Sequence, residues 1–192
     1  MRHLSTALAG LLVAATSWVP AAAYEIDPFT REPTSYYPRS HRAYPTTIRR
    51  QVVNFPAGYA PGTVVVSTSH RRLYYVLGGG QALSYGVGVG RPGFTWAGTK
   101  TITMKREWPD WRPPAEMLKR RPDLPRYMAG GIRNPLGARA MYLGSSMFRI
   151  HGSNEPETIG RAVSSGCIRM TNADVVDLYQ RVRVGTRVVV LR

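Results

Sequence analysis

The sequence predicts a mainly β domain with one or two short helices over residues 62–192, preceded by a flexible N-terminal arm. Three observations predict it. After residue 61, short runs of β-branched and aromatic residues alternate with glycines, one later segment carries a helix-capping pattern, and the stretch before residue 62 is rich in proline. The chain has 192 residues, a length that fits one domain of ordinary size with a tail.

The first 23 residues have the composition of a secretory signal peptide. A basic start is followed by an apolar run over residues 8–15 and by the small residues 21–23, which is the order that such peptides require. The apolar run is too short to span a bilayer stably. We therefore expect cleavage after Ala23 and an exported mature chain without a transmembrane segment.

The chain is strongly basic. It carries 26 Lys and Arg against 11 Asp and Glu, a net charge of +15, and all but three of the basic residues are arginine. Arginine favours planar, bidentate contacts with carboxylates and phosphates. Because export keeps the chain away from chromosomal DNA and cytosolic RNA, we expect no nucleic-acid partner and look for the anionic partner in the cell envelope.

Residues 24–61 are predicted to form an extended, weakly structured arm. The segment is punctuated by proline, is rich in Tyr and Arg, and shows no sustained period of either strand or helix. Two functions stay open for it: a plain tether, or a surface whose tyrosines stack on a polymer.

The first strands of the domain follow from β-branched and aromatic runs. Residues 63–69 and 72–77 are typical of strands, and the glycines at 78–80 turn the chain into a third strand over residues 82–89. Alternation of side-chain types predicts a fourth strand over residues 99–105.

The second half of the domain is predicted to contain the helices. The Pro- and Trp-rich residues 108–125 leave room for one or two helical turns at 115–120. Thr171 followed by Asp174 is a variant of the capping box, so a helix is expected over residues 172–180. The further strands expected are residues 140–143, 147–150 and 186–191, the last of them apolar enough for the centre of a sheet.

Two cofactor patterns are excluded. Gly88, Gly90 and Gly93 have the spacing of a dinucleotide-binding motif, but Pro92 lies within it and no helix pattern follows. The histidines are scattered, and no pair of histidines or carboxylates has metal-ligand spacing. We therefore expect no cofactor and no metal.

The candidate chemistry lies between His151 and Cys167. Cys167 is the one cysteine of the chain, and an unpaired thiol in an exported protein is a candidate reactive group. His151 ends a predicted strand and can hold the thiol as thiolate, so we expect a depressed pKa for Cys167. The N–H groups of Gly166 and Cys167 are expected to face a tetrahedral oxyanion. Arg169, on the same side of an extended segment as Cys167, adds positive potential.

These motifs resemble the catalytic block of the L,D-transpeptidases, the YkuD-type domain. The resemblance covers residues 62–192 and rests on Asn134-Pro135-Leu136-Gly137, Tyr142-Leu143-Gly144, His151-Gly152-Ser153, Ile159-Gly160, Ser164-Ser165-Gly166-Cys167-Ile168-Arg169-Met170, Asn172, Asp174, Asp177-Leu178-Tyr179 and Val184-Gly185-Thr186. It implies a β-sandwich-type catalytic domain in which Cys167 is the nucleophile and His151 its base, with the imidazole oriented by a backbone carbonyl.

The resemblance also implies roles for further residues. Those expected to form the oxyanion hole or to bind substrate are Gly166, Ser165, Arg169, Gly152, Asn134 and Tyr142. Some family members carry His where this chain has Ser165, and Asn where it has Arg169, so the shape of the donor pocket stays open. Arg169 either steers a substrate carboxylate or pairs with Asp174, and Asn134 either lines the donor cleft or makes a turn.

Family members are similar in reaction. Their thiolate attacks the carbonyl of the third residue, usually meso-diaminopimelate, of a peptidoglycan tetrapeptide stem; D-Ala leaves and a thioester remains. An amine then resolves the thioester, either on a second stem, which gives a 3-3 cross-link, or on an outer-membrane protein or lipoprotein. The resemblance therefore implies a periplasmic, wall-associated enzyme whose partners are peptidoglycan stem peptides.

Two alternatives stay open. One is a thiol carboxypeptidase or endopeptidase that acts on the same wall peptides and uses water as acceptor. The other is a non-catalytic wall-binding module in which Cys167 is buried and inert, because a lone cysteine is often just a small buried hydrophobe.

Overall fold

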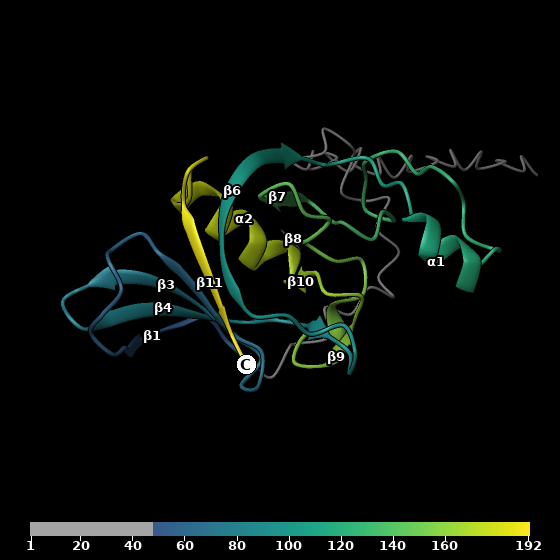
Figure 1. The fold of residues 1–192 in the computed structure, drawn as a ribbon. Coiled ribbons are helices and arrows are strands. Elements are labelled where there is room, and N and C mark those ends of the chain that lie inside the picture. Colours follow the sequence, from purple (N-terminus) through teal and green to yellow (C-terminus); the bar gives the residue numbers. More distant parts are fainter. Residues whose placement is uncertain (1–47) are drawn as a thin grey trace, which may run out of the picture. The chain divides into compact units, whose positions relative to one another are not determined.

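The computed structural model describes residues 48–192. The predicted signal peptide and most of the predicted arm lie outside the described residues. The described part is rich in strands and has two α-helices, α1 (Ala115–Arg120) and α2 (Asn172–Arg181), as Figure 1 shows. It confirms the prediction of a mainly β fold with short helices. Within residues 48–192, no helix is long and apolar enough to cross a bilayer.

Most strands belong to one hydrogen-bonded series. Its order is β1–β4–β3–β2–β11–β6–β7–β8–β10, and β5 and β9 form a separate pair. The bounds in chain order are β1 Gln51–Asn54, β2 Val64–Ser67, β3 Arg72–Gly78, β4 Gln81–Gly86, β5 Val89–Gly90, β6 Gly98–Glu107, β7 Arg139–Leu143, β8 Arg149–His151, β9 Ala162–Ser164, β10 Ile168–Arg169 and β11 Arg187–Leu191.

Strand β6 joins two halves of this series. Its first residues pair with β11 and its later residues pair with β7, with an irregular register between Ile102 and Met104. Such an irregularity lets one strand bend and serve two sheets. In Figure 1, β6 is the long curved arrow between the β1–β4–β3–β2–β11 half and the β7–β8–β10 half. This arrangement agrees with the predicted sandwich type.

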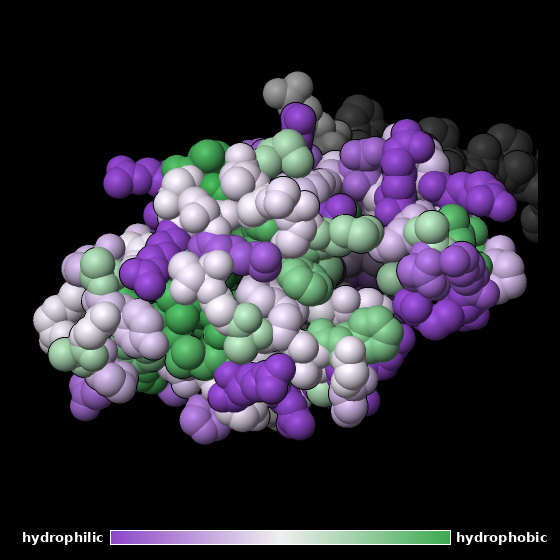
Figure 2. All heavy atoms as spheres, in the orientation of Figure 1, coloured by the Kyte–Doolittle hydropathy of each residue, from purple (hydrophilic) through white to green (hydrophobic). Residues whose placement is uncertain are grey.

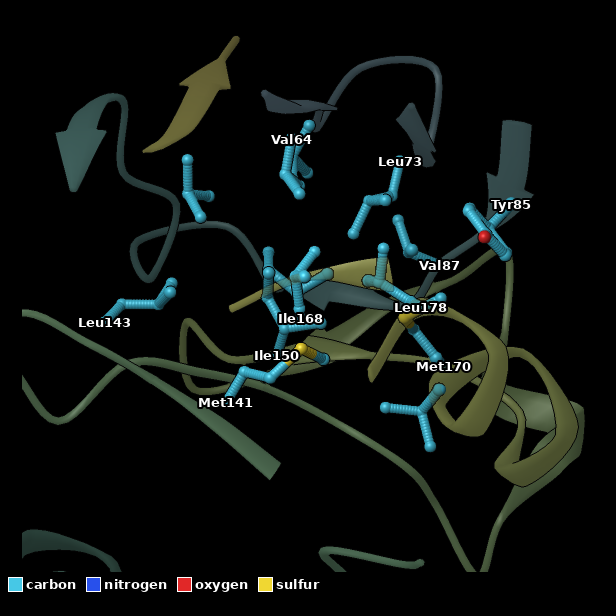
Figure 3. Packing of buried hydrophobic residues seen from close by; sticks show 14 of the residues in the cluster. Val64, Leu73, Tyr85, Val87, Met141, Leu143, Ile150, Ile168, Met170 and Leu178 are labelled. Carbon is cyan, nitrogen blue, oxygen red and sulfur yellow. The ribbon is translucent and has the colours of Figure 1, made fainter. Parts of the chain in front are cut away.

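The core lies between the two halves. Val64 and Leu73 from the first half pack with Met141 and Ile150 from the second, and Leu178 of α2 joins them; Figure 3 shows the packing. All five side chains are fully buried. Removing this much apolar surface from water is the main force that holds the two halves together.

Helix α2 starts as its sequence predicts. The Thr171 hydroxyl accepts a hydrogen bond from the Asp174 N–H at 3.1 Å, which satisfies one of the free donors of the first turn. The cap fixes where the helix begins, and it begins directly after β10, the strand that follows Cys167.

The end of the predicted arm is part of the sheet, which corrects the predicted extent of that arm over residues 24–61. Strand β1 pairs antiparallel with β4. The Phe55 ring packs against Tyr59 and Tyr74 on the outer face of the sheet. Strand β1 has only four residues, which are too few to show a strand period in a proline-rich segment. Its hydrogen bonds to β4 stabilise it as a strand.

The sequence did not predict several other short elements. The expected strand over residues 82–89 is divided into β4 and β5, and β5 pairs with β9 rather than with its neighbours in sequence. Strands β9 and β10 and the 3-10 turn Pro156–Thr158 are two or three residues long. Elements of this length have no detectable periodicity.

Candidate active site

Two adjacent parallel strands bring His151 and Cys167 to one surface. In the pairing of β10 with β8, Ile168 lies opposite Ile150 and Arg169 lies opposite His151. Both isoleucines are buried in the core. Because side chains alternate along a strand, the residues beside the isoleucines point to the opposite face. His151 and Cys167, 16 positions apart in sequence, thus share that face.

This face forms one wall of a cleft of about 430 Å³. The other wall comes from the segment that contains α1, defined here as the α1 segment (residues 109–137). Figure 2 shows the surface hollowed between the α1 side, where hydrophilic side chains gather, and the rest of this face. The lining residues include Arg149, His151, Ser164, Ser165, Cys167 and Arg169 on one wall and Trp111, Met117, Arg120 and Leu136 on the other.

His151 is held as a neutral base. Its Nδ1 lies 2.6 Å from the Gly152 carbonyl oxygen, and because a carbonyl only accepts, Nδ1 carries the proton and Nε2 keeps its lone pair. Burial, together with the positive charges of Arg169 and Arg149, lowers the pKa of His151 to about 3, against the opposing effect of hydrogen bonds to the backbone of Gly152 and Leu136. The backbone carbonyl takes the orienting role expected from the family resemblance.

Cys167 is a half-buried thiol at the cleft. Its Sγ donates to the Met147 carbonyl oxygen at 3.7 Å. Burial raises the pKa of the thiol, although Arg149 and Arg169 act in the opposite direction. The predicted depressed pKa is therefore wrong for the free protein, because loss of hydration outweighs the nearby positive charge. The resting pair is a neutral thiol and a neutral imidazole.

The turn that carries the thiol, the Cys167 loop (residues 164–167), is fixed by side chains. The Ser164 hydroxyl donates to the Cys167 carbonyl at 2.6 Å and accepts from the Gly166 N–H at 3.1 Å. The Trp96 indole N–H donates to the Gly166 carbonyl at 2.8 Å. Since the C=O and N–H of a trans peptide point in opposite directions, the Trp96 contact directs the Cys167 N–H away from the indole.

These bonds correct one expectation. The Gly166 N–H already donates to Ser164, so it does not serve as the second oxyanion donor. Gly166 is needed for a different reason: its φ is +104° and a Cβ would lie 2.5 Å from the Phe148 ring. The backbone donor that the loop provides is the Cys167 N–H.

Arg169 is paired, but with a partner that was not expected. Its Nη1 lies 2.9 Å from Glu155 Oε2, not against Asp174. Its backbone exchanges two hydrogen bonds with Gly88. The glycine-spaced segment that was excluded as a dinucleotide motif therefore lies against β10. Gly88 allows this close approach, because a Cβ there would lie 3.3 Å from the Arg169 Cβ.

The remaining predicted residues have different positions. Ser165 lines the cleft. Asn134 is buried beneath it, and its amide donates to the carbonyls of Pro109, Met128 and Ala129. Asn134 thus ties the α1 segment together and does not line the cleft. Its Oδ1 accepts from the Leu136 N–H at 2.9 Å and its carbonyl accepts from the Gly137 N–H at 3.0 Å, so it makes the turn that was its alternative role. Tyr142 also lies outside the lining, with its ring 4.9 Å from the Arg149 guanidinium.

Gly152 contributes through its backbone and its lack of a side chain. Its carbonyl orients His151, and a Cβ at this position would lie 2.3 Å from Asn172 Oδ1. The same oxygen accepts from the Ala138 N–H. Gly152 is therefore required where the His151 strand, α2 and the end of the α1 segment meet.

Sequence reasoning missed Arg149, Ser164 and Trp96. Arg149 precedes His151 by two positions on a strand, so alternation alone could have placed it on the same face. Ser164 could have been found as a hydroxyl able to bond its own turn. Trp96 has no such signal, because its partner is 70 positions away in sequence. In the described residues, no cluster of three His, Cys, Asp or Glu side chains could hold a metal.

Comparison with known proteins points to one family. A family model described as the L,D-transpeptidase catalytic domain matches residues 61–190. The Escherichia coli (strain K12) protein named Probable L,D-transpeptidase ErfK/SrfK is 36% identical over 137 residues, which cover 67% of this chain and 43% of that protein. The Bacillus subtilis protein named Putative L,D-transpeptidase YkuD is 46% identical over 69 residues, 34% of this chain and 42% of that protein. The chain matches less than half the length of these relatives.

Solved structures have the same fold. An L,D-transpeptidase from Mycobacterium smegmatis matches with a TM-score of 0.56 at 19% identity and covers 69% of this chain and 59% of that chain. At this identity the likeness shows the fold alone. A Brucella melitensis structure whose title names a probable carnitine operon oxidoreductase is 46% identical, with a TM-score of 0.52, and covers 78% of this chain and 97% of that chain.

Proposed function

We propose, from the premise that this chain belongs to the L,D-transpeptidase (YkuD) family, that it is a peptidoglycan L,D-transpeptidase in which Cys167 is the nucleophile and His151 its base. The acyl donor is a tetrapeptide stem, and the bond cleaved joins meso-diaminopimelate to the terminal D-Ala. The observation that carries the proposal is the β8–β10 pairing, which sets one thiol and one neutral imidazole on the same cleft.

In the first step the thiol becomes an acyl carrier. The proton of Cys167 Sγ passes to His151 Nε2, and sulfur bonds to the carbonyl carbon of the third stem residue. The oxyanion that forms accepts a hydrogen bond from the Cys167 N–H. The carbon–nitrogen bond then breaks, His151 returns the proton to the departing D-Ala amine, and a thioester remains.

In the second step an amine resolves the thioester. The amine of a second stem attacks the carbonyl carbon, its proton passes to His151, and the sulfur leaves and regains a proton from the imidazolium. The product is a 3-3 cross-link. An amine of an outer-membrane protein would give a wall–protein link instead, and water would give a shortened stem.

The resting protonation states support this use of His151. A base whose imidazole is neutral at pH 7 is ready to accept a proton. A thiol whose pKa is raised stays protonated until an acyl group arrives, so its ionisation is coupled to attack.

Export to the periplasm is part of the proposal, because the substrate lies outside the cytoplasm. It is supported by the signal-peptide pattern of residues 1–23. The net charge of +15 suits stems that carry several carboxylates.

Mass spectrometry of muropeptides tests the proposal. The purified protein, incubated with tetrapeptide stems, should release D-Ala and form cross-linked dimers, and the Cys167→Ala variant should do neither while it unfolds at an unchanged temperature. Adding a free amine should divert the products to its amide. Release of D-Ala by Cys167→Ala would show that the nucleophile is another group.

A further inference from the structure

Arg149 lies beside the thiol and meets the same backbone oxygen. Its Nη1 donates to the Met147 carbonyl at 3.2 Å, and Cys167 Sγ donates to that carbonyl at 3.7 Å. Arg149 also lines the cleft, on the same strand face as His151. The guanidinium and the sulfur therefore converge on one point of the cleft wall.

The guanidinium of Arg149 has a donor without an acceptor. Its Nε is buried and has no hydrogen-bond partner within residues 48–192. A buried donor on a cation that is left unpaired is costly, and a purely structural arginine would have an acceptor here. The ring of Tyr142, 4.9 Å from the guanidinium, supports its plane but accepts no in-plane hydrogen bond.

Two other arginines of this half of the domain form ion pairs with glutamates, whereas Arg149 forms none within the described residues. Arg169 pairs with Glu155 at 2.9 Å, and Arg139 pairs with Glu107 at 3.2 Å. Among the described residues, no carboxylate lies within ion-pair distance of Arg149. Arg149 is thus a positive charge beside the thiol without an anionic partner among the described residues. It lies at the cleft, where the carboxylate of a ligand can pair with it.

We propose that Arg149 binds the free carboxylate of the residue that leaves during acyl transfer, and so selects donors in which that carboxylate directly follows the scissile amide bond. The inference rests on the proposed function. When Cys167 Sγ bonds to the scissile carbonyl, the carboxylate of the leaving residue lies only two bonds beyond the scissile nitrogen. The guanidinium of Arg149 lines the cleft and can offer that carboxylate charge-assisted hydrogen bonds.

The test compares two synthetic donors that differ in one group. One tetrapeptide stem ends in D-Ala with its free carboxylate, and the other ends in D-alaninamide. With the unchanged protein, kcat/KM for release of the terminal residue should be about 10- to 100-fold higher for the carboxylate donor, the range expected for hydrogen bonds to a charged group.

Variants assign this preference to Arg149. Arg149→Met should remove the preference by lowering kcat/KM for the carboxylate donor alone, and Arg149→Lys should keep part of it. Arg183→Met, a change at an exposed arginine outside the cleft lining, should keep all of it. The unfolding temperature of Arg149→Met should change little, because removal of the unpaired buried Nε offsets the loss of the hydrogen bond to Met147.

The outcomes separate the two proposals. An equal loss of kcat/KM with both donors in Arg149→Met, or no preference in the unchanged protein, would overturn the assignment of Arg149 and leave the transpeptidase proposal standing. Failure of the unchanged protein to release a terminal residue from either donor would overturn the transpeptidase proposal, and this inference with it.

Discussion

At the scale of single residues, the chemistry of the candidate site depends on how the surrounding protein shifts the pKa values of His151 and Cys167. His151 is buried beside two arginines, and both factors favour the neutral ring. Cys167 loses hydration in the same place, and this favours the neutral thiol. The two residues therefore begin in the protonation states that a coupled transfer requires, rather than as a preformed ion pair.

The buried imidazole should also affect stability. The unfolded chain binds a proton at His151 near pH 6.5, whereas the folded chain holds the ring neutral down to a pKa of about 3. Below pH 6.5 the unfolded state then binds more protons, so the free energy of unfolding should fall as the pH is lowered toward 3.

Urea unfolding at several pH values measures this effect. In His151→Asn the fall in the free energy of unfolding between pH 6.5 and 3 should be smaller than in the unchanged protein. Equal slopes for the two proteins would mean that His151 binds its proton at the same pH in the folded and the unfolded chain, so that burial does not lower its pKa.

Residue types and spacing were enough to choose two of these residues as candidates. Cys167 and His151 could be chosen because the one cysteine of the chain lies in a glycine-containing turn that follows a strand-ending histidine. The bonding of Gly166 and the pKa of Cys167 could not be predicted. The first depends on the rotamer of Ser164, and the second depends on how much protein covers the sulfur.

At the scale of elements, the conformation of the Cys167 loop depends on contacts with segments that are distant in sequence. Trp96 donates to Gly166, and its ring stacks on Phe148 with centroids 4.7 Å apart and planes 8° from parallel. The segment between β5 and β6 thereby sets the orientation of the peptide that precedes Cys167.

Trp96→Phe separates the hydrogen bond from the stacking. The variant keeps a ring against Phe148 but loses the donor to Gly166, so we expect a stability loss of about 1 kcal/mol. We expect kcat to fall several-fold with KM unchanged, because the peptide positions an oxyanion donor rather than the substrate. A matched control, Tyr59→Phe on the outer face of the sheet, should leave kcat unchanged. An unchanged kcat in Trp96→Phe would remove the indole from the positioning of the loop.

Prediction of the elements succeeded where they are long. The expected helix over residues 172–180 and the expected strand over residues 99–105 match α2 and β6 to within a few residues. The two-residue β10 was missed although it carries the register that brings Cys167 to His151. A pairing between two short strands is decided by tertiary packing, which periodicity does not record.

At the scale of the whole domain, the folded unit begins earlier than its sequence predicts. Strand β1 covers the edge of β4, and Phe55 and Tyr59 cover Tyr74 and the outer faces of Val65 and Val76. The composition of residues 24–61 hides this, because prolines and arginines surround the few residues that pair.

Two shortened chains test this boundary. A chain that starts at residue 62 should be less stable than one that starts at residue 48, by about 2–4 kcal/mol, the value of two partly buried aromatic side chains. Chemical unfolding of both chains measures the difference. Equal free energies of unfolding would place the boundary at residue 62, where the sequence alone puts it.

In the proposed reaction Cys167 carries the acyl group, and mass spectrometry of the intact protein detects that group as added mass. After brief incubation with a tetrapeptide stem and no amine acceptor, the mass should increase by that of the stem without its terminal D-Ala, and digestion should locate the addition on Cys167. Release of D-Ala with the addition on another residue, or with unmodified Cys167 throughout turnover, would show that Cys167 is not the acyl carrier.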